Sequence, residues 1–346
     1  MLPRVTTEAH SEQFLIVHAD ARDPSAFEIE RAIVEGAGAR LELTRSSAEA
    51  ELIDNLRAAD AILVSSAQIT RTVVESMPRC RLIVRSGVGL DTLDIPAATE
   101  HGIVVAHFPD FCQPEVANHA IMLLLACAKQ LASLDRAVRD GRWRPGPLAS
   151  MGPIHGETLG LIAFGNIAEE VAPRAQALGL RVIAFDPYIS DEPFQRMAVE
   201  RVASQEELLR RSDYVSLHPP LTAETRHLMG AAQFQQMKRS ACLINTSRGP
   251  VVDEPALIEA LRSGAIASAG LDVFEHEPLP ADSPLVEMEN VVLTPHSASY
   301  SDPAVEKLKH RVGQTAVELM QGRWPDASAV VANPEVRPRA ALQGHS

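Results

Sequence analysis

The stretch LGLIAFGNIAEEVAPRAQALGLRVIAFD, residues 159–186, decides the expected fold of this chain. It opens with an apolar run over residues 159–164 and reaches a turn at Gly165. Apolar residues then recur at helical spacing up to Gly179. A second β-rich run over residues 181–185 ends at Asp186. The stretch therefore predicts a strand, a tight turn, a helix and a second strand that ends in an acid.

This order of elements is typical of a dinucleotide-binding site. Backbone N–H groups of the turn can approach a pyrophosphate there, and the helix N-terminus adds partial positive charge. Asp186 follows Gly165 by 186 − 165 = 21 residues, where a carboxylate can accept both hydroxyls of an adenosine ribose. The predicted cofactor contacts here are Phe164, Gly165, Asn166, Ile167 and Asp186.

The glycine pattern of the turn is incomplete. The expected GxGxxG reads AFGNIA over residues 163–168, so that Ala163 replaces the first glycine and its Cβ restricts φ. A plain strand-to-helix turn is the alternative interpretation of this hexapeptide. The surrounding strands and Asp186 favour the dinucleotide, and we expect NAD rather than NADP because Asp186 repels a 2′-phosphate.

The composition limits the classes of function. A chain of 346 residues with 46% hydrophobic residues suggests two domains of ordinary size. Its net charge of −13 argues against nucleic acid or an anionic membrane as a partner. The four cysteines show no CxxC and no metal spacing, so we expect reduced thiols, no metal site and a cytoplasmic location. The longest apolar run, residues 120–128, is too short to span a bilayer.

Short β-rich runs alternate with helical patterns along the chain, which predicts an α/β protein with two doubly wound parallel sheets. The first sheet is expected from residues 14–17, 41–43, 61–64, 82–85 and 103–106. The second is expected from residues 159–164, 181–185, 199–202, 214–217, 241–245, 267–271 and 291–293. The second set has the size of a Rossmann sheet, which binds its ligand at the carboxyl ends of the strands.

Polar residues follow the later strands of this second set. Because those strand ends share one edge of the sheet, the following residues are expected to face the cofactor: His218, Pro219, Thr246, Ser247, Arg248, Asp272 and His296.

Three of the polar residues after these strands form a candidate catalytic set: Arg248, Glu277 and His296. A guanidinium can hold a carboxylate in a bidentate manner, and a histidine can donate a proton to a carbonyl oxygen as a hydride arrives. A carboxylate on the other ring nitrogen fixes the histidine tautomer. Taken singly, each residue also fits a bland role, as a surface ion pair, a solvated acid or a capped core histidine.

The heptapeptide RSGVGLD, residues 85–91, ends the fourth strand of the first sheet. Gly87, Val88 and Gly89 can expose successive N–H groups that bind the carboxylate of an anionic substrate. A simple glycine turn is the alternative. Arg85 can point at the same anion or form a surface ion pair.

Together these motifs resemble the D-isomer-specific 2-hydroxyacid dehydrogenases. The resemblance rests on RSGVGLD, AFGNIAEEVA, SLHPPLTAETRHL, LINTSRGPVVD, LDVFEHEP and TPHSASYSD. The stretches PDFCQPEVANHA and RVIAFDPY are most similar to the branch with phosphoglycerate dehydrogenase-like enzymes and C-terminal-binding proteins.

The resemblance implies a flavodoxin-like substrate domain, residues 1–113 and 300–346, with an NAD-binding Rossmann domain inserted at residues 114–299. It implies that Arg248 anchors a small anionic 2-oxo or 2-hydroxy acid, that His296 is the acid/base and that Glu277 is its partner. It also implies that Asp272 meets the nicotinamide and that two copies form a homodimer through the NAD-binding domains.

Other interpretations stay open at this point. A regulatory protein that senses NAD(H) with little turnover is the main alternative, and oxidation of formate or phosphite is a further one. Residues 139–156 are expected to form an irregular arm that can clasp a second subunit, and the Pro-rich tail from residue 333 is expected to fray.

Overall fold

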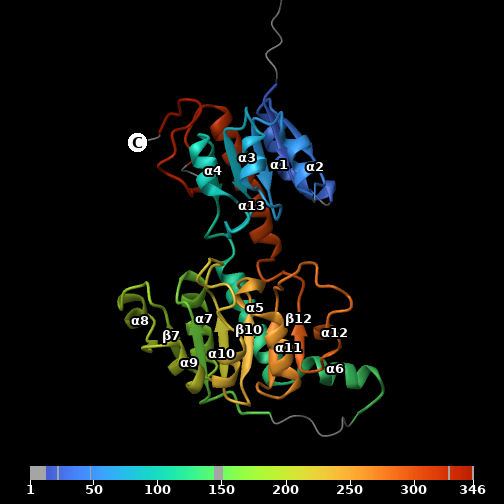
Figure 1. Ribbon diagram of the computed structural model, residues 1–346, viewed down its shortest axis with the longest axis vertical. Helices are drawn as coiled ribbons and strands as arrows, with labels where there is room; N and C mark the ends of the chain where they lie inside the picture. Colours follow the sequence, from blue (N-terminus) through green and yellow to red (C-terminus); the bar gives the residue numbers. More distant parts are fainter. Residues whose placement is uncertain (1–12, 22, 47, 144–150, 326–327, 345–346) are drawn as a thin grey trace, which may run out of the picture. The chain divides into compact units, whose positions relative to one another are not determined.

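The computed structural model describes residues 13–21, 23–46, 48–143, 151–325 and 328–344. The chain divides into two units, one within Met1–Phe111 and Asp302–Ser346 and the other within Cys112–Ser301. Figure 1 shows that each unit has its own sheet with helices packed around it. Residues 144–150 of the expected arm lie outside the described residues.

The first unit is built from both ends of the chain. Its strands are β1 (Leu15–His18), β2 (Arg40–Leu43), β3 (Ala61–Val64), β4 (Leu82–Arg85), β5 (Val104–His107) and β13 (Val330–Val331). Its helices are η1 (Pro24–Phe27), α1 (Glu28–Gly36), α2 (Glu49–Leu56), α3 (Arg71–Glu75), α4 (Ile95–Glu100) and α13 (Asp302–Met320).

The sheet of the first unit has the strand order β13-β5-β4-β3-β1-β2. Strands β1 to β5 are parallel and follow the flavodoxin-like order 2-1-3-4-5, as predicted. The edge strand β13, which was not among the expected strands, pairs with β5 in the antiparallel direction. An antiparallel edge is possible because β13 arrives from α13 and needs no crossover.

The C-terminal tail is bound to the first unit along its described part, contrary to the expected fraying. The Asn333 side chain accepts the Val105 N–H at 2.8 Å and donates to the Ile103 carbonyl at 2.9 Å. Arg339 donates to the carbonyls of Met77 at 2.7 Å and Cys80 at 2.9 Å. These side chains satisfy backbone groups that would otherwise be buried without partners, so the tail completes the unit.

The second unit is continuous in sequence. Its strands are β6 (Thr158–Ile162), β7 (Arg181–Phe185), β8 (Glu200–Arg201), β9 (Tyr214–Leu217), β10 (Cys242–Asn245), β11 (Ser268–Leu271) and β12 (Val291–Leu293). Its helices are α5 (Gln113–Ala128), α6 (Leu131–Arg139), α7 (Asn166–Ala177), α8 (Glu192–Arg196), α9 (Gln205–Arg211), α10 (Ala231–Gln236), η2 (Gly249–Val251), α11 (Glu254–Arg262) and α12 (Pro284–Glu287).

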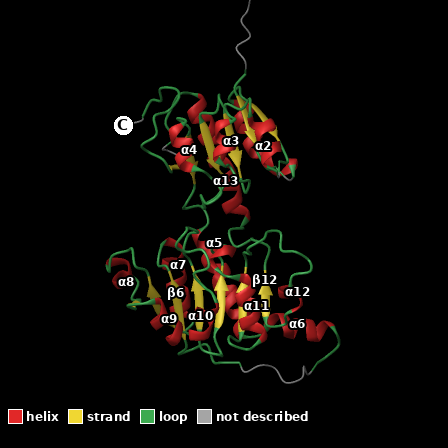
Figure 2. Cartoon of the chain, in the orientation of Figure 1, coloured by secondary structure: helices red, strands yellow, loops and turns green. Residues whose placement is uncertain are grey.

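The second sheet has the order β12-β11-β10-β9-β6-β7-β8, and all of its pairings are parallel. This is the Rossmann order with one further strand, which confirms the predicted fold class. The chain reverses direction across the sheet between β6 and β9, and ligands of such sheets bind beyond the carboxyl ends at this switch point. The yellow strands of Figure 2 stand between layers of red helices in this unit.

Several helices begin at a side chain that accepts a hydrogen bond from the first turn. Thr70 caps α3, Asp94 caps α4, Ser204 caps α9 and Asp253 caps α11. Each such cap contributes about 1 kcal/mol by pairing an N–H group that has no partner inside the helix. The caps therefore explain why these short helices start where they do.

The helix α5 is apolar on most sides and is buried against α7, β10 and β11. Pro114 lies in its first turn, where the missing N–H costs nothing. Leu123 packs directly over β11, because a Cβ on Gly270 would come within 2.9 Å of the Leu123 Cβ atom. The helix also carries His119 toward the loop after β12, where its Nε2 lies 2.9 Å from the Thr294 hydroxyl.

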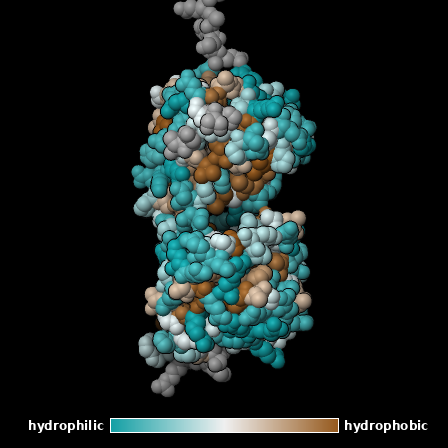
Figure 3. Space-filling model, turned by 90° about the vertical axis from the view of Figure 1, so that its left-hand side faces the viewer, coloured by the Kyte–Doolittle hydropathy of each residue, from teal (hydrophilic) through white to brown (hydrophobic). Residues whose placement is uncertain are grey.

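The surfaces and thiols of the units bear on the expected class of protein. Hydrophilic side chains cover most of the face seen in Figure 3, with a hydrophobic patch on the first unit and more scattered apolar residues on the second. Cys80, Cys112, Cys127 and Cys242 are buried free thiols. Among the described residues, no helix has the length and apolar character needed to cross a bilayer.

Candidate active site

The turn after β6 keeps the backbone path of a dinucleotide loop although its first glycine is missing. Ala163 has φ +64°, the left-handed region that glycine adopts most easily. Gly165 is the N-cap of α7 and supplies no side-chain cap, and a Cβ there would meet nothing within 4 Å. Gly165 therefore leaves room beside the first turn of α7, and the N–H groups of a helix N-terminus suit a pyrophosphate.

Asp186 lies at the end of β7 and is tied to the turn by its own carboxylate. One oxygen accepts the Phe164 N–H at 3.0 Å and the other accepts the Tyr188 N–H at 2.8 Å. The residue is 8% exposed. Each carboxylate oxygen can accept a second hydrogen bond, so the two amides orient Asp186 and leave acceptor positions for ribose hydroxyls.

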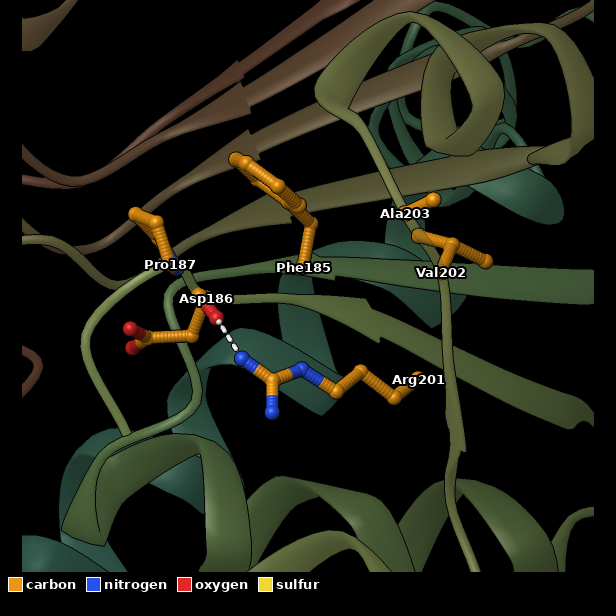
Figure 4. Close-up of a pocket in the computed structure, with 6 residues that line it drawn as sticks. All are labelled: Phe185, Asp186, Pro187, Arg201, Val202 and Ala203. Carbon is orange, nitrogen blue, oxygen red and sulfur yellow. Dashed lines mark hydrogen bonds between the residues drawn. The ribbon is translucent and has the colours of Figure 1, made fainter. Parts of the chain in front are cut away.

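An open pocket of about 400 Å³ lies at the ends of β7 and β8 and is lined by Phe185, Asp186, Pro187, Arg201, Val202 and Ala203. Figure 4 shows the Arg201 guanidinium reaching the Asp186 backbone carbonyl, a contact of 2.8 Å, while the carboxylate points away from it. The second Arg201 nitrogen donates to Asp191. Sequence analysis missed Arg201, although its place on the strand next to β7 was the available signal.

The ends of β9 and β10 contribute the next predicted cofactor residues. His218 and Pro219 follow β9, and burial lowers the pKa of His218 to about 4. The Thr246 hydroxyl at the end of β10 is buried and has no hydrogen-bond partner among the described residues. Such an unpaired buried hydroxyl at the carboxyl edge of the sheet fits a bound dinucleotide, which could supply the missing partner.

Arg248 follows Thr246 and Ser247 in a loop that is closely packed. The Asn245 side chain donates to the Arg248 carbonyl at 2.9 Å and accepts the Ser247 hydroxyl at 2.8 Å. The next residue, Gly249, approaches the loop after β11, because a Cβ there would lie 1.8 Å from the Phe274 carbonyl oxygen. Glycine is therefore required at 249, and the Arg248 loop rests on the loop that leads to Glu277.

Glu277 and His296 form the pair that the sequence predicted. The His296 Nδ1 atom lies 2.6 Å from one Glu277 carboxylate oxygen, and the other oxygen accepts the Phe274 N–H at 3.0 Å. The His296 side chain is 47% exposed and the Glu277 side chain is 34% exposed, so Nε2 of the histidine is accessible. His296 also has φ +50°, an uncommon backbone conformation for a residue with a Cβ.

Asp272 is buried beneath the loop that carries His296. Its carboxylate accepts the Thr294 hydroxyl at 2.6 Å, the Ser297 N–H at 2.9 Å and the Ala298 N–H at 2.9 Å. Burial by itself raises the pKa of Asp272, but the hydrogen bonds from these groups and from His119 outweigh burial and hold the pKa below its ordinary value. A contact of Asp272 with a nicotinamide stays a prediction.

The predicted carboxylate-binding loop lies in the first unit. Arg85 donates from Nε to the Gly89 carbonyl at 2.9 Å, and His107 Nδ1 lies 3.0 Å from the Val88 carbonyl. The loop carbonyls are thus held by the protein, whereas the amides of Val88 and Gly89 have no acceptor within the described part of the chain. Arg85 therefore shapes the loop through its carbonyls.

Comparison with known proteins shows the family of this chain. A model of the D-isomer specific 2-hydroxyacid dehydrogenase NAD binding domain matches residues 121–298. The chain belongs to the D-isomer-specific 2-hydroxyacid dehydrogenase family. It is therefore an oxidoreductase of this family, and its second unit is the NAD-binding Rossmann domain.

Relatives of this dehydrogenase include enzymes with different substrates. Glyoxylate reductase of Korarchaeum cryptofilum is 40% identical over 278 residues, which are 79% of this chain and 83% of that one. D-lactate dehydrogenase from Aquifex aeolicus, solved with NAD and lactic acid, has a TM-score of 0.78 and 27% identity and covers 89% of this chain and 96% of its own.

A third similar protein uses the other nicotinamide cofactor. The NADPH-dependent glyoxylate/hydroxypyruvate reductase of Sinorhizobium meliloti, solved with NADP and malonate, has a TM-score of 0.82 and 28% identity. It covers 95% of this chain and 99% of its own.

Among the described residues of the dehydrogenase, no cluster of three His, Cys, Asp or Glu side chains could hold a metal ion.

Proposed function

We propose that this dehydrogenase interconverts a small 2-oxo acid and the D-2-hydroxy acid, with His296 as the acid/base. The observation that carries the proposal is the 2.6 Å contact between His296 Nδ1 and the Glu277 carboxylate. A carboxylate there keeps a proton on Nδ1 and stabilises the charged imidazolium, so Nε2 can donate a proton to a carbonyl oxygen. In the reverse direction Nε2 takes the proton from the hydroxyl.

The remaining roles follow from the groups that each loop presents. Bound NAD(H) supplies or accepts the hydride, so the protein has to orient the substrate and move one proton. Arg248 has a guanidinium that can hold the substrate carboxylate with two parallel hydrogen bonds. The free amides of Val88 and Gly89 offer a second site for carboxylate oxygens, and Arg85 acts by shaping that loop.

We further propose that the enzyme prefers NAD to NADP. The Asp186 carboxylate is held at the ribose position by two amides, and its charge opposes a 2′-phosphate. The Arg201 cation in the same pocket is paired with Asp191, which reduces its use as a phosphate ligand. The residues Pro187 and Tyr188 carry no positive charge.

A cytoplasmic location and a homodimer complete the proposal. Four buried free thiols are typical of a reducing compartment. The helix α6 exposes large apolar side chains, with Leu131 at 58% and Val138 at 55%, and Trp143 beyond it is 84% exposed. Apolar residues on one exposed helix are best explained by a second copy that covers them.

The test is a panel of glyoxylate, hydroxypyruvate, pyruvate and bulkier 2-oxo acids, with NADH and NADPH, followed by absorbance of the reduced cofactor. We expect turnover with NADH on at least one small acid. His296→Ala should lower kcat by about 10²- to 10⁴-fold, the usual contribution of a positioned acid/base. Arg248→Ala should lower kcat/KM by about a hundredfold, because a charged anchor is lost.

His155→Ala, which removes an exposed histidine of the same unit, serves as the matched control and should keep the wild-type rate. An unchanged kcat in His296→Ala would refute the proton-transfer role. Tight NADH binding without turnover on any acid would support the regulatory alternative, and a preference for NADPH would refute the role given to Asp186.

A further inference from the structure

His296 is held in a backbone conformation that it would not adopt by itself. Its φ of +50° lies in the left-handed region, which is unfavourable for a residue with a Cβ. Such a conformation persists only where the surrounding structure imposes it. Neighbouring groups must therefore impose it on the loop of residues 294–298.

The carboxylate of Asp272 binds this loop on both sides of the histidine. Before His296 it accepts the Thr294 hydroxyl, and after His296 it accepts the N–H groups of Ser297 and Ala298. The Asp272 carbonyl accepts the His296 N–H itself at 2.8 Å. One fully buried residue thus determines the path of the backbone through the proposed acid/base.

His119 reaches the same carboxylate from α5, a different layer of the unit. Its Nε2 atom lies 2.9 Å from the Thr294 hydroxyl oxygen and 3.4 Å from an Asp272 carboxylate oxygen. A hydroxyl has one proton, and Thr294 donates it to Asp272, so His119 must be the donor to Thr294. The order of donation is His119 to Thr294 to Asp272, with the His119 side chain 14% exposed.

We propose that His119 and Thr294, acting through Asp272, are positioning residues that hold His296 in its reactive orientation. The inference rests on the proposed function, because it concerns the acid/base assigned there. Neither side chain is a catalytic residue, since both act only through the loop. The network joins the buried helix α5 to the exposed loop of His296, which gives this end of the site a buried support.

The network makes a specific kinetic prediction. Loss of the Thr294 hydroxyl removes one of the Asp272 donors and leaves His119 Nε2 with only the more distant Asp272 carboxylate oxygen at 3.4 Å, while the hydrogen bonds from the Ser297 and Ala298 amides remain. The loop should then populate other backbone conformations in which Nε2 of His296 is misplaced. The expected result is a lower kcat with KM little changed, because substrate and dinucleotide contacts are retained.

The experiment compares Thr294→Val, which keeps the shape and removes the hydroxyl, with Thr294→Ser, which keeps the hydroxyl. We expect Thr294→Val to lower kcat about tenfold and Thr294→Ser to stay within about threefold of wild type. The dissociation constant of NADH, measured by fluorescence titration, should stay within about twofold in both. If Thr294→Val does not fold, His119→Leu and His119→Gln replace it. Leucine removes the N–H donor to Thr294, whereas glutamine retains one, so only His119→Leu should lower kcat.

The deciding measurement repeats Thr294→Val in the His296→Ala background. A network that acts only through His296 should have less than a twofold effect there, whereas a general structural defect should again lower the rate about tenfold. Equal losses in both backgrounds, or no loss in the wild-type background, would overturn the inference and leave the proposed function standing. A wild-type kcat in His296→Ala alone would overturn both.

Discussion

Two single residues with side chains hold a left-handed backbone at the loops that matter most in the second unit. Ala163 does so in the dinucleotide turn with φ +64°, and His296 does so in the proposed acid/base loop with φ +50°. At His296 the conformation is imposed by Asp272 and is part of the proposed mechanism. At Ala163 the methyl group has no such use, because glycine would follow the same path without strain.

Ala163→Gly should therefore stabilise the second unit. Relief of the left-handed strain, about 1–2 kcal/mol, exceeds the greater backbone entropy of glycine in the unfolded chain, about 0.4–1 kcal/mol. We expect an unfolding free energy higher by about 0.5–1 kcal/mol and a thermal midpoint higher by roughly 1–4 °C. The NADH dissociation constant should stay within about twofold, because the turn already has the glycine path.

Ala177→Gly, at the exposed end of α7, is the matched control and should lower the midpoint, because glycine weakens a helix. A lower midpoint in Ala163→Gly as well would show that the turn carries no strain to relieve.

At the scale of the element, the helix α6 exposes an unusual amount of apolar surface. Leu131 and Val138 are seven residues apart, which places them on one side of the helix, and both are more than half exposed. Ala137, about 100° around the helix from Val138, is buried in the unit. The helix thus has apolar side chains on two sides. Only the side with Ala137 packs against other described residues of the unit.

We predict that the double variant Leu131→Asp with Val138→Asp is a monomer when the mass is measured by light scattering, whereas the wild type is a dimer. Two buried acids without partners would cost an interface several kcal/mol. Leu178→Asp changes a similarly apolar exposed residue outside α6 and should leave the dimer intact. A wild-type protein that is already monomeric at micromolar concentration would contradict the proposed interface.

At the scale of the whole molecule, each unit contains a histidine whose pKa is strongly lowered. Burial lowers the pKa of His18 in the first unit and of His218 in the second to about 4. Asp20 attracts a proton to His18 from 3.5 Å, but burial outweighs it. Between pH 6.5 and 4 these histidines become protonated in the unfolded chain but stay neutral in the folded units. The free energy of unfolding therefore falls as the pH falls.

Each histidine should cost its unit up to about 3 kcal/mol of unfolding free energy between pH 7 and pH 4. His18→Leu should reduce this pH-dependent loss of stability in the first unit, because leucine does not titrate. The substitution should also break no hydrogen bond, because neither ring nitrogen of His18 has a hydrogen-bond partner among the described residues. Denaturant unfolding at pH 7.5 and pH 5 measures the difference. Leu56→Met exchanges one buried side chain for another without a titrating group, so it should retain the wild-type change of unfolding free energy with pH. An equally large change in His18→Leu would exclude His18 as the cause.

Much of the fold could be predicted because its signals are local in the chain. The β-rich runs, the glycine after β6 and Asp186 after β7 are read within short segments, and parallel strands must place their carboxyl ends at one edge. The tail could not be predicted, because Asn333 and Arg339 find partners more than 200 residues away. Arg201 was missed although a strand over residues 199–202 was expected, because only the tertiary structure places β8 beside β7 and turns the Arg201 side chain toward Asp186.

The residue types at the strand ends suffice to indicate Glu277 and His296 as an acid/base pair, because chemistry and chain order both restrict the choice. The hydrogen-bond network beneath them could not be predicted from the sequence, because only the tertiary structure brings its members together. His119 lies 175 residues before Thr294, and neither position has a sequence pattern that links it to the other. Only the packing of α5 beside the end of β12 brings them together, and the buried Asp272 carboxylate that accepts the Thr294 hydroxyl then holds the loop that carries His296.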